Sequence, residues 1–289
     1  MLDKISKFLL NKDLDVSKVY TYLKKYGYIK DTFSLEDIAT GIIRLKRTAG
    51  LDFSSETIDG KLVRAMESPR CSLPDYEFLI EEAGSVPKWG MKTLTYFVRG
   101  YDEEMSREDW EQTVRVALDN ISAVCGLTFI KVQSAKEANL IYDVGRGRQD
   151  DFDGSSGTLA WFQLPSSSSY RGQLFGKFDL DETWIPFGKN GRGIYLENVV
   201  CHETMHGLGV SHVSVPNSLI NPFYNPSINK PMKEDIRQLN DLRYGPAIQT
   251  NPRPTEPTPT PVPNGNTTII LSGQISKIEI PGYRISKIN

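Results

Sequence analysis

Residues 202–212, HETMHGLGVSH, contain every histidine of the 289-residue chain. His202 and His206 are four residues apart, so on a helix their imidazoles lie on one face and can bind the same cation. Gly209 can adopt the left-handed conformation that ends a helix and turns the chain, which would bring His212 toward the same point from another direction. The segment therefore predicts a helix, a glycine turn and a metal site with three imidazole ligands.

Glu203 follows the first histidine and lies about 100° around the helix from it, close to the ion without needing to bind it. Three neutral imidazoles leave a zinc ion its full 2+ charge and a fourth position for water, whose pKa the ion lowers to about 7. The alternative is three unrelated histidines, two on a buried face and one in a loop, because a bare HExxH also occurs by chance. The glycine and the third histidine in register favour the zinc site.

The composition is that of an ordinary globular protein and argues against several classes of function. A formal net charge of −2 gives no basic footprint for nucleic acid, and no apolar stretch approaches the length of a membrane span. The N-terminal residues MLDKISKFLL carry too short an apolar run to resemble a signal peptide. The odd number of cysteines (Cys71, Cys125 and Cys201) leaves at least one free thiol, and we expect the last two to pack in the core.

The first 68 residues predict a small three-helix module. Val16–Tyr28 carries apolar side chains at helical spacing, and Ser34 can cap a second helix. Apolar residues near Leu62 mark a third. Residues 69–87 contain three prolines and a glycine, which predicts an irregular connector.

From residue 88 the pattern alternates strands with helices, which predicts an α+β domain with a mixed sheet. Strands are expected at Leu94–Val98, Leu127–Val132 and Leu140–Val144. Helices are expected after Ser106, near Tyr195 and near Lys233. Residues 145–182 are rich in glycine, serine and aspartate and are expected to form a loop region.

Two segments follow the predicted domain. Residues 247–266 are rich in proline and threonine, which predicts an extended linker. Residues 267–289 alternate isoleucine and leucine with polar residues, as short strands do, but are too few to close a core. We assign them no role.

Two motifs together give the chain its resemblance to a known family. Residues 202–212 resemble the metal segment of the metzincins. Residues 69–75, PRCSLPD, look like the cysteine switch of the matrixins, or matrix metalloproteinases, whose usual pattern is PRCGxPD. The resemblance covers nearly all of residues 15–246. It implies an α+β fold: a three-helix prodomain, then a metzincin catalytic domain with a twisted, mixed five-stranded sheet and three helices.

The resemblance also divides the chain into parts. It implies an inhibitory propeptide at 1–75, an activation linker at 76–87 and a catalytic domain at 88–246. Residues 86–89, VPKW, match the usual start of the mature enzyme. The chain would then be a latent zymogen that another protease activates.

In such a zymogen the thiolate of Cys71 takes the fourth position on the zinc and excludes water. The resemblance implies that Arg70 pairs with Asp75 to hold the loop. Ser72 stands where the family usually has glycine, which predicts a looser latency.

By the same resemblance the chain is a zinc-dependent endopeptidase, with Glu203 as the base that takes a proton from water and gives it to the leaving amine. The strand at 157–160 would hold an extended peptide along its unpaired edge. The implied substrate-binding residues are Leu159, Ala160, Val199, Pro222 and Tyr224, which favour an apolar residue after the scissile bond. Ile220 replaces the methionine beneath the metal, which predicts lower stability rather than lost chemistry.

Further metal sites are judged from the same resemblance. A calcium site is expected at Asp153, Gly154, Asp179 and Glu182, although an acidic loop can equally be solvated surface. The positions of a second, structural zinc carry Gln149, Trp161 and Lys177 in place of histidines. Only Asp151 of that ligand set remains, so we predict that this zinc is absent.

The implied partners are protein or peptide substrates and an activating protease, and we expect a monomer located outside the cell. Two other interpretations remain open. One is a zinc-containing binding protein that has lost turnover, suggested by Ile220 and the missing structural zinc. The other is a cell-wall-binding protein that uses the N-terminal module. Retention of Glu203 opposes the first, and the motif around Cys71 opposes the second.

Overall fold

The structure is a computed structural model that describes residues 5–9, 15–31, 33–75, 88–165 and 172–245. The predicted activation linker at 76–87, the linker at 247–266 and the segment at 267–289 lie outside the described residues.

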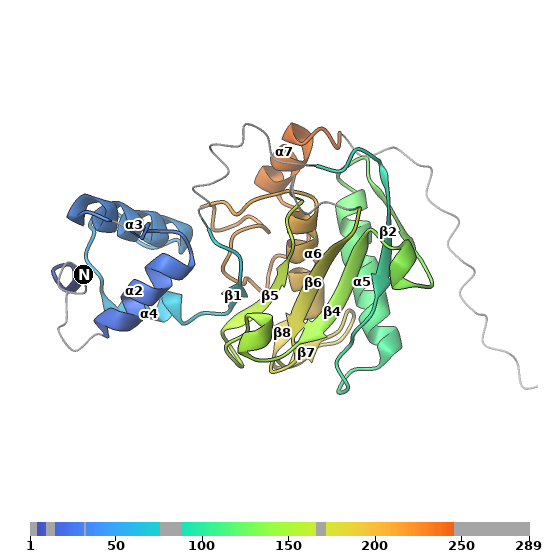
Figure 1. Cartoon of the computed structure of the whole chain (residues 1–289), viewed down its shortest axis with the longest axis horizontal. Helices are drawn as coiled ribbons and strands as arrows, with labels where there is room; N and C mark the ends of the chain where they lie inside the picture. The colour runs from blue at the N-terminus through green and yellow to red at the C-terminus, as the bar shows by residue number, and fades with distance from the viewer. Residues whose placement is uncertain (1–4, 10–14, 32, 76–87, 166–171, 246–289) are drawn as a thin grey trace, which may run out of the picture. The chain divides into compact units, whose positions relative to one another are not determined.

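Three helices precede the sheet and pack around a core of their own (Figure 1). They are α2 (Val16–Lys25), α3 (Leu35–Thr48) and α4 (Gly60–Met66). On α3, Ser34 and Asp37 form a reciprocal capping box that satisfies backbone N–H groups of the first turn. The core residues on these helices include Val19, Leu23, Ile38, Ile42, Leu45 and Leu62. The predicted three-helix module is confirmed.

Six strands form one sheet in the order β1-β5-β6-β4-β2-β3 (Figure 1). Their bounds are β1 Arg70–Cys71, β2 Thr93–Val98, β3 Thr128–Lys131, β4 Leu140–Gly145, β5 Thr158–Phe162 and β6 Leu174–Asp179. Neighbouring strands are parallel except β5 with β6, so the sheet is mixed. Five strands come from the predicted catalytic domain. The sixth, β1, precedes residue 76 and was not expected in the sheet.

Two long helices, α5 (Arg107–Ser122) and α6 (Leu196–Gly207), pack against each other and against the sheet (Figure 1). Trp110 of α5 is fully buried and lies edge-on to Phe178 of β6, with ring centroids 6.0 Å apart. The remaining elements are η1 Ala135–Glu137, η2 Arg148–Asp150, β7 Trp184–Ile185, β8 Ile194–Tyr195 and α7 Lys233–Asp241. Among the described residues, no helix combines the length and apolar character needed to cross a bilayer.

The prediction of a loop region at 145–182 is wrong, because β5 and β6 lie within it. Of these two strands, only β5 was expected, at 157–160, from the family resemblance. Gly176 interrupts the apolar alternation of β6, which hides the strand in the sequence. It is paired with Phe162 of β5, and a Cβ on Gly176 would lie 2.1 Å from the Phe162 ring. The glycine therefore makes room for a neighbouring aromatic ring.

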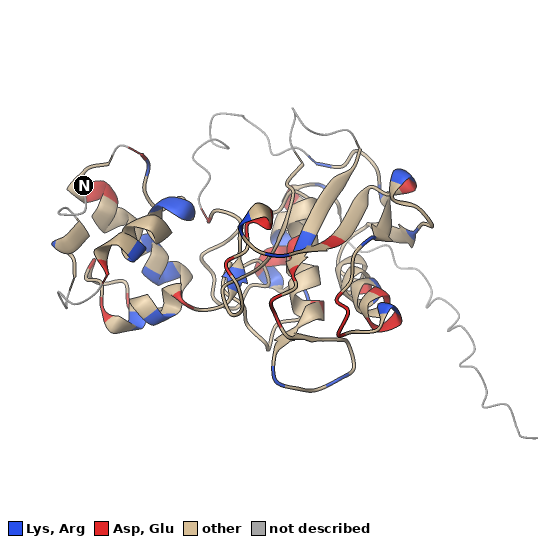
Figure 2. Ribbon diagram, turned by 60° about the horizontal axis from the view of Figure 1, so that its bottom comes forward, with Lys and Arg blue, Asp and Glu red and all other residues tan. Residues whose placement is uncertain are grey.

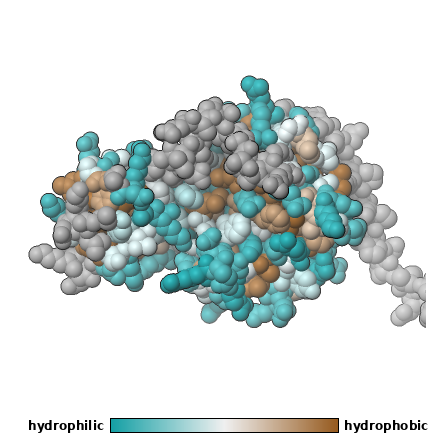
Figure 3. All heavy atoms as spheres, in the orientation of Figure 1, coloured by the Kyte–Doolittle hydropathy of each residue, from teal (hydrophilic) through white to brown (hydrophobic). Residues whose placement is uncertain are grey.

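The described surface is mixed in charge and in hydropathy. In Figure 2, acidic and basic residues are interspersed along the helices. On the face that Figure 3 shows, apolar residues lie among hydrophilic ones. Single exposed apolar residues of this kind are normal for a folded protein.

Candidate metal centre

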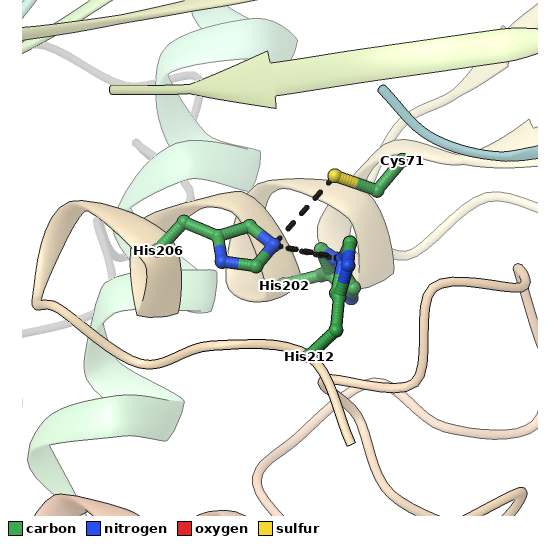
Figure 4. Close-up of side chains that lie close together, drawn as sticks. All are labelled: Cys71, His202, His206 and His212. Atoms are coloured by element: carbon green, nitrogen blue, oxygen red, sulfur yellow. Dashed lines mark hydrogen bonds between the residues drawn. The ribbon is translucent and has the colours of Figure 1, made fainter. Parts of the chain in front are cut away.

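Four side chains that are far apart in the sequence meet at one point (Figure 4). His202 and His206 lie on α6, His212 lies on the loop that follows, and Cys71 lies on β1. Their ligand atoms all lie within 4.8 Å of one another. Among the residues that the structure describes, this is the one group of three or more His, Cys, Asp or Glu ligands placed to hold a metal ion.

The local sequence explains how the imidazoles meet. One turn of α6 separates His202 from His206, and their Nε2 atoms are 3.2 Å apart. The helix ends at Gly207, and Gly209 has a φ of +94°, the left-handed conformation that turns the chain. The turn brings Nε2 of His212 to 3.3 Å from that of His202 and 3.0 Å from that of His206.

The outer ring nitrogens show which atoms are free to bind an ion. His202 Nδ1 lies 2.7 Å from the carbonyl oxygen of Leu219, and His206 Nδ1 lies 2.8 Å from that of Val210. A carbonyl only accepts, so each Nδ1 carries the proton and each Nε2 presents a lone pair. Burial lowers the pKa of His202 to about 3 and that of His206 well below its usual value, so both rings are neutral. Lone pairs that face one another at 3.2 Å repel, and a cation between them removes that repulsion. The residues therefore fit a zinc ion.

Cys71, on β1, completes the group. Its Sγ is 3.6 Å from Nε2 of His206 and accepts a 3.4 Å hydrogen bond from the backbone N–H of Leu73. The side chain is buried, and burial raises the pKa of the thiol. A cation within reach of the sulfur would reverse this effect, because metal binding deprotonates a thiol.

Glu203 lies beside the group without entering it. Its Oε1 is 4.0 Å from Nε2 of His202, and the side chain is fully buried. Neither carboxylate oxygen makes a hydrogen bond of normal geometry within the described part of the chain, although the Cys71 thiol and the backbone N–H of Phe162 lie close enough to lower its pKa. Burial raises the pKa of this carboxyl to about 8. A buried carboxylate with free acceptor atoms beside a metal site can take up and release a proton.

The peptide around Cys71 lies between two backbone edges. On one side it pairs with β5: Arg70 N–H donates to Gly157 (3.0 Å), and Ser72 N–H donates to Ala160 (2.9 Å). On the other side Cys71 N–H donates to the carbonyl of Pro222 at 3.0 Å. The β5 edge, expected to be unpaired, is therefore occupied in this chain.

The predicted substrate-binding residues fall into two groups. Leu159, Val199, Pro222 and Tyr224 line one cavity, together with Cys71, His202 and Glu203. Ala160 does not line it and instead pairs with the segment that carries Cys71. Ser72 is not among the residues with positive φ, so serine in place of glycine causes no backbone strain there.

Arg70 and Asp75 form an ion pair in which both side chains are 2% exposed. Tyr26 covers the guanidinium, whose carbon lies 3.4 Å from the ring centroid, and Phe223 lies 5.1 Å from it on another side. Tyr28 donates its hydroxyl hydrogen to Asp75. The aromatic neighbours were not predicted, because nothing in the spacing of Tyr22 and Tyr26 indicates that they contact a buried cation.

A second group missed from the sequence supports the turn beneath the histidines. Asp235, in the first turn of α7, is fully buried and accepts hydrogen bonds from the backbone N–H groups of Leu219 (2.9 Å) and Ile220 (3.1 Å). It also accepts from the hydroxyl of Ser218. An acidic residue at a helix start usually caps its own helix, so the sequence gives no sign of this second role.

The residues predicted for calcium lie around one loop. Asp153 Oδ1 accepts from Thr158 N–H and Glu182 Oε1 accepts from Ser156 N–H, both at 2.6 Å. Burial, with the nearby acids, raises the pKa of Asp179 and of Glu182, and Asp179 Oδ2 has no partner among the described residues. Gly154 has a φ of +93°. Calcium binding stays a prediction.

At the positions examined for a structural zinc, Lys177 donates to Asp150 in a partly buried ion pair. The indole N–H of Trp161 donates to the backbone carbonyl of Asp150 at 2.8 Å. The partner of the lysine is therefore Asp150 and not Asp151, the remaining acid of the predicted ligand set. The ammonium group of Lys177 therefore links β6 to η2.

We expect Lys177→Met to lower the free energy of unfolding by about 1 kcal/mol, because it leaves the partly buried Asp150 carboxylate without its cation. The melting temperature should fall by about 2–4 °C. Lys189→Met, which removes a more exposed pair with Asp109, is the control and should change little.

Metal analysis of the purified chain should give a single zinc ion, and two zinc ions per chain would contradict the predicted absence of the structural zinc.

Comparison with known proteins agrees with this geometry. Residues 88–245 match the peptidase family described as matrixin. Human matrix metalloproteinase-25 is 33% identical over 264 residues, covering 82% of this chain and 46% of the human protein. Horse interstitial collagenase is 31% identical over 252 residues, covering 82% of this chain and 50% of that protein. The chain thus spans about half the length of the curated relatives it matches.

A mixed sheet backed by a helix that carries two histidines, with a third after a glycine turn, defines a metallopeptidase-type domain. With the family match over residues 88–245, the chain belongs to the matrixin family.

Proposed function

We propose that the chain is the latent form of a zinc endopeptidase. Its propeptide would be residues 1–75, its activation linker 76–87 and its catalytic domain 88–246. The observation that carries the proposal is the convergence of three imidazoles and one propeptide sulfur within 4.8 Å, beside a buried glutamate.

In this proposal His202, His206 and His212 hold the zinc ion. When bound, the ion supplies a polarising charge that makes water nucleophilic at neutral pH and stabilises negative charge on the carbonyl oxygen. Glu203 moves the proton: one oxygen accepts it from the attacking water and then gives it to the leaving amine. The Cys71 thiol beside the carboxylate would leave with the propeptide, so the carboxylate would then be available for both transfers.

The substrate would be an extended peptide segment. The propeptide supports this proposal because its own extended segment binds there: the backbone around Cys71 donates hydrogen bonds to Ala160 on one side and to Pro222 on the other. A substrate would take the same backbone edges by strand addition. The cavity lined by Leu159, Val199 and Tyr224 would accept an apolar side chain next to the scissile bond.

Latency would depend on the same segment. The sulfur of Cys71 lies where a water molecule would have to lie, and the buried pair of Arg70 with Asp75 holds the loop. The end of α3 adds further contacts: Asn221 donates to the carbonyl of Thr48 at 2.9 Å. Removal of residues 1–75 by an activating protease would free the groove.

The names of the relatives suggest where the enzyme acts. Several are called matrix metalloproteinases or interstitial collagenases. We extend from these names the proposal that this chain acts outside the cell on exposed protein segments, as a monomer. Calcium at Asp153, Asp179 and Glu182 would be a second, structural cofactor.

The test is cleavage of a fluorogenic peptide before and after limited proteolysis or treatment with a thiol-reactive mercurial. We expect cleavage only after treatment, and loss of cleavage when zinc is removed by a chelator. A zinc-loaded, processed chain that cleaves no peptide from a varied library would favour a binding protein that has lost turnover.

Specificity provides a separate prediction. Of two peptides that differ only after the scissile bond, the one with leucine should be cleaved at least about 100-fold faster than the one with aspartate, because the cavity would bury an unpaired carboxylate. The ratio of kcat/KM for the two peptides measures this. Equal rates would mean that the cavity does not receive this side chain.

A further inference from the structure

The three histidines of the metal centre differ in the groups that their Nδ1 atoms contact. Those of His202 and His206 face backbone carbonyls of the predicted catalytic domain, at Leu219 and Val210. The Nδ1 atom of His212 faces the propeptide instead and lies 3.1 Å from Oδ1 of Asp75. It also lies 3.2 Å from the carbonyl oxygen of Pro74. One metal ligand is therefore oriented by residues that activation would remove.

The carboxylate of Asp75 is itself held firmly. Arg70 donates to Oδ1, and the hydroxyl of Tyr28 donates to Oδ2. The backbone N–H of Asp75 donates to the carbonyl of Tyr26 at 3.0 Å. The side chains of Asp75 and His212 are 2% and 1% exposed.

A carboxylate that accepts from the outer N–H of a metal-binding histidine fixes the tautomer, orients the ring and makes the ligating nitrogen more basic. Loss of such a partner typically weakens metal binding by about 10- to 100-fold. This contribution is separate from that of a sulfur bound directly to the ion.

We propose that Asp75 is a positioning residue for the metal centre. Through it the propeptide would orient His212 and so stabilise bound zinc in addition to the Cys71 sulfur. The proposal rests on the proposed function, because it requires zinc at the three histidines. It adds that activation removes the His212 partner together with the Cys71 sulfur. The latent chain would therefore bind zinc more tightly than the activated chain, and the Cys71 sulfur alone would not account for the whole difference.

The first test is the rate at which zinc passes from the zinc-loaded full-length chain to an excess of a chromogenic chelator. A Glu203→Gln background prevents self-cleavage. Asp75→Asn, which keeps the shape but removes the charge, should release zinc about 10- to 100-fold faster than the parent. The acceleration should persist with Cys71→Ala, since it does not depend on the sulfur.

Tyr28→Phe is the matched control. It removes a hydrogen bond to the other oxygen of Asp75 and loosens the same loop, but leaves the contact with His212. Zinc release should stay within about 3-fold of the parent. Equal acceleration in Asp75→Asn and Tyr28→Phe would mean that docking of the loop holds the ion, and would overturn the proposal.

A second readout uses the small number of histidines. With three in the chain, selective ¹⁵N labelling gives three imidazole spin systems. Asp75→Asn should shift the Nδ1–H signal of His212 or speed its exchange with water, while those of His202 and His206 stay in place. The Asp75 proposal fails if zinc is bound and the His212 signal is unmoved. The proposed function fails instead if the parent chain binds no zinc.

Discussion

Cys71→Ala should make the full-length chain an active peptidase without any cleavage. The substitution removes the sulfur that lies 3.6 Å from Nε2 of His206, so water can reach the fourth position on the ion. A sulfur ligand worth about 3 kcal/mol or more would hold the uninhibited fraction below about 1%, so activity should rise at least about 100-fold. The measurement is kcat/KM for a fluorogenic peptide on the intact chain, checked by mass.

The kcat/KM of the full-length Cys71→Ala chain should remain below that of the processed enzyme, because the rest of the propeptide still occupies the groove. The backbone hydrogen bonds from Arg70 to Gly157 and from Ser72 to Ala160 do not depend on the thiol. Neither does the hydrogen bond from the Asn221 side chain to the carbonyl of Thr48. Cys125→Ala, at a cysteine buried beside α5, is the matched control and should not activate the chain. If Cys71→Ala stays as inactive as the parent while the processed enzyme is active, the sulfur is not the switch.

Glu203→Gln should abolish turnover and leave zinc bound. The amide has nearly the same shape as the carboxylate but cannot accept the proton, so we expect kcat/KM of the processed enzyme to fall by about 100- to 10,000-fold. The three imidazoles are untouched, so the zinc content should not change. Peptide cleavage and metal analysis on one sample give both values.

Glu197→Gln is the matched control on the same helix. Glu197 is also buried, and its carboxylate accepts from Asn120 at 2.8 Å, but it does not line the cavity beside the metal centre. It should lose little activity. If the processed parent and Glu203→Gln cleave peptide alike, the assignment of Glu203 as the base is wrong.

The local elements of this protein were predictable because their signals are local. Ser34 and Ser106 sit at the caps of α3 and α5, as their side chains indicated. The spacing of His202 and His206 on one helical face placed two imidazoles together, and Gly209 placed the turn. The fold class followed from the same patterns.

The sequence did not reveal the strands in which apolar and polar residues fail to alternate clearly. The residue pattern placed both β5 and β6 in a loop, and a strand at 157–160 was expected only from the family resemblance. Gly176 breaks the pattern of β6, where it makes room for the ring of Phe162 from the neighbouring strand. The sixth strand, β1, has two residues and pairs with a strand almost ninety positions later, at Thr158. Pairing at that separation leaves no periodic trace in the sequence.

The sequence by itself determined the three-helix module, the mixed sheet and the identity of the residues that gather at the metal centre. Only the tertiary structure decided which groups support them: Asp75 against His212, Asp235 beneath Ile220, and aromatic rings around Arg70. Caps, turns and helix faces are fixed by neighbours within a few residues. The partners of a buried charge are fixed by where distant segments meet when the cores close.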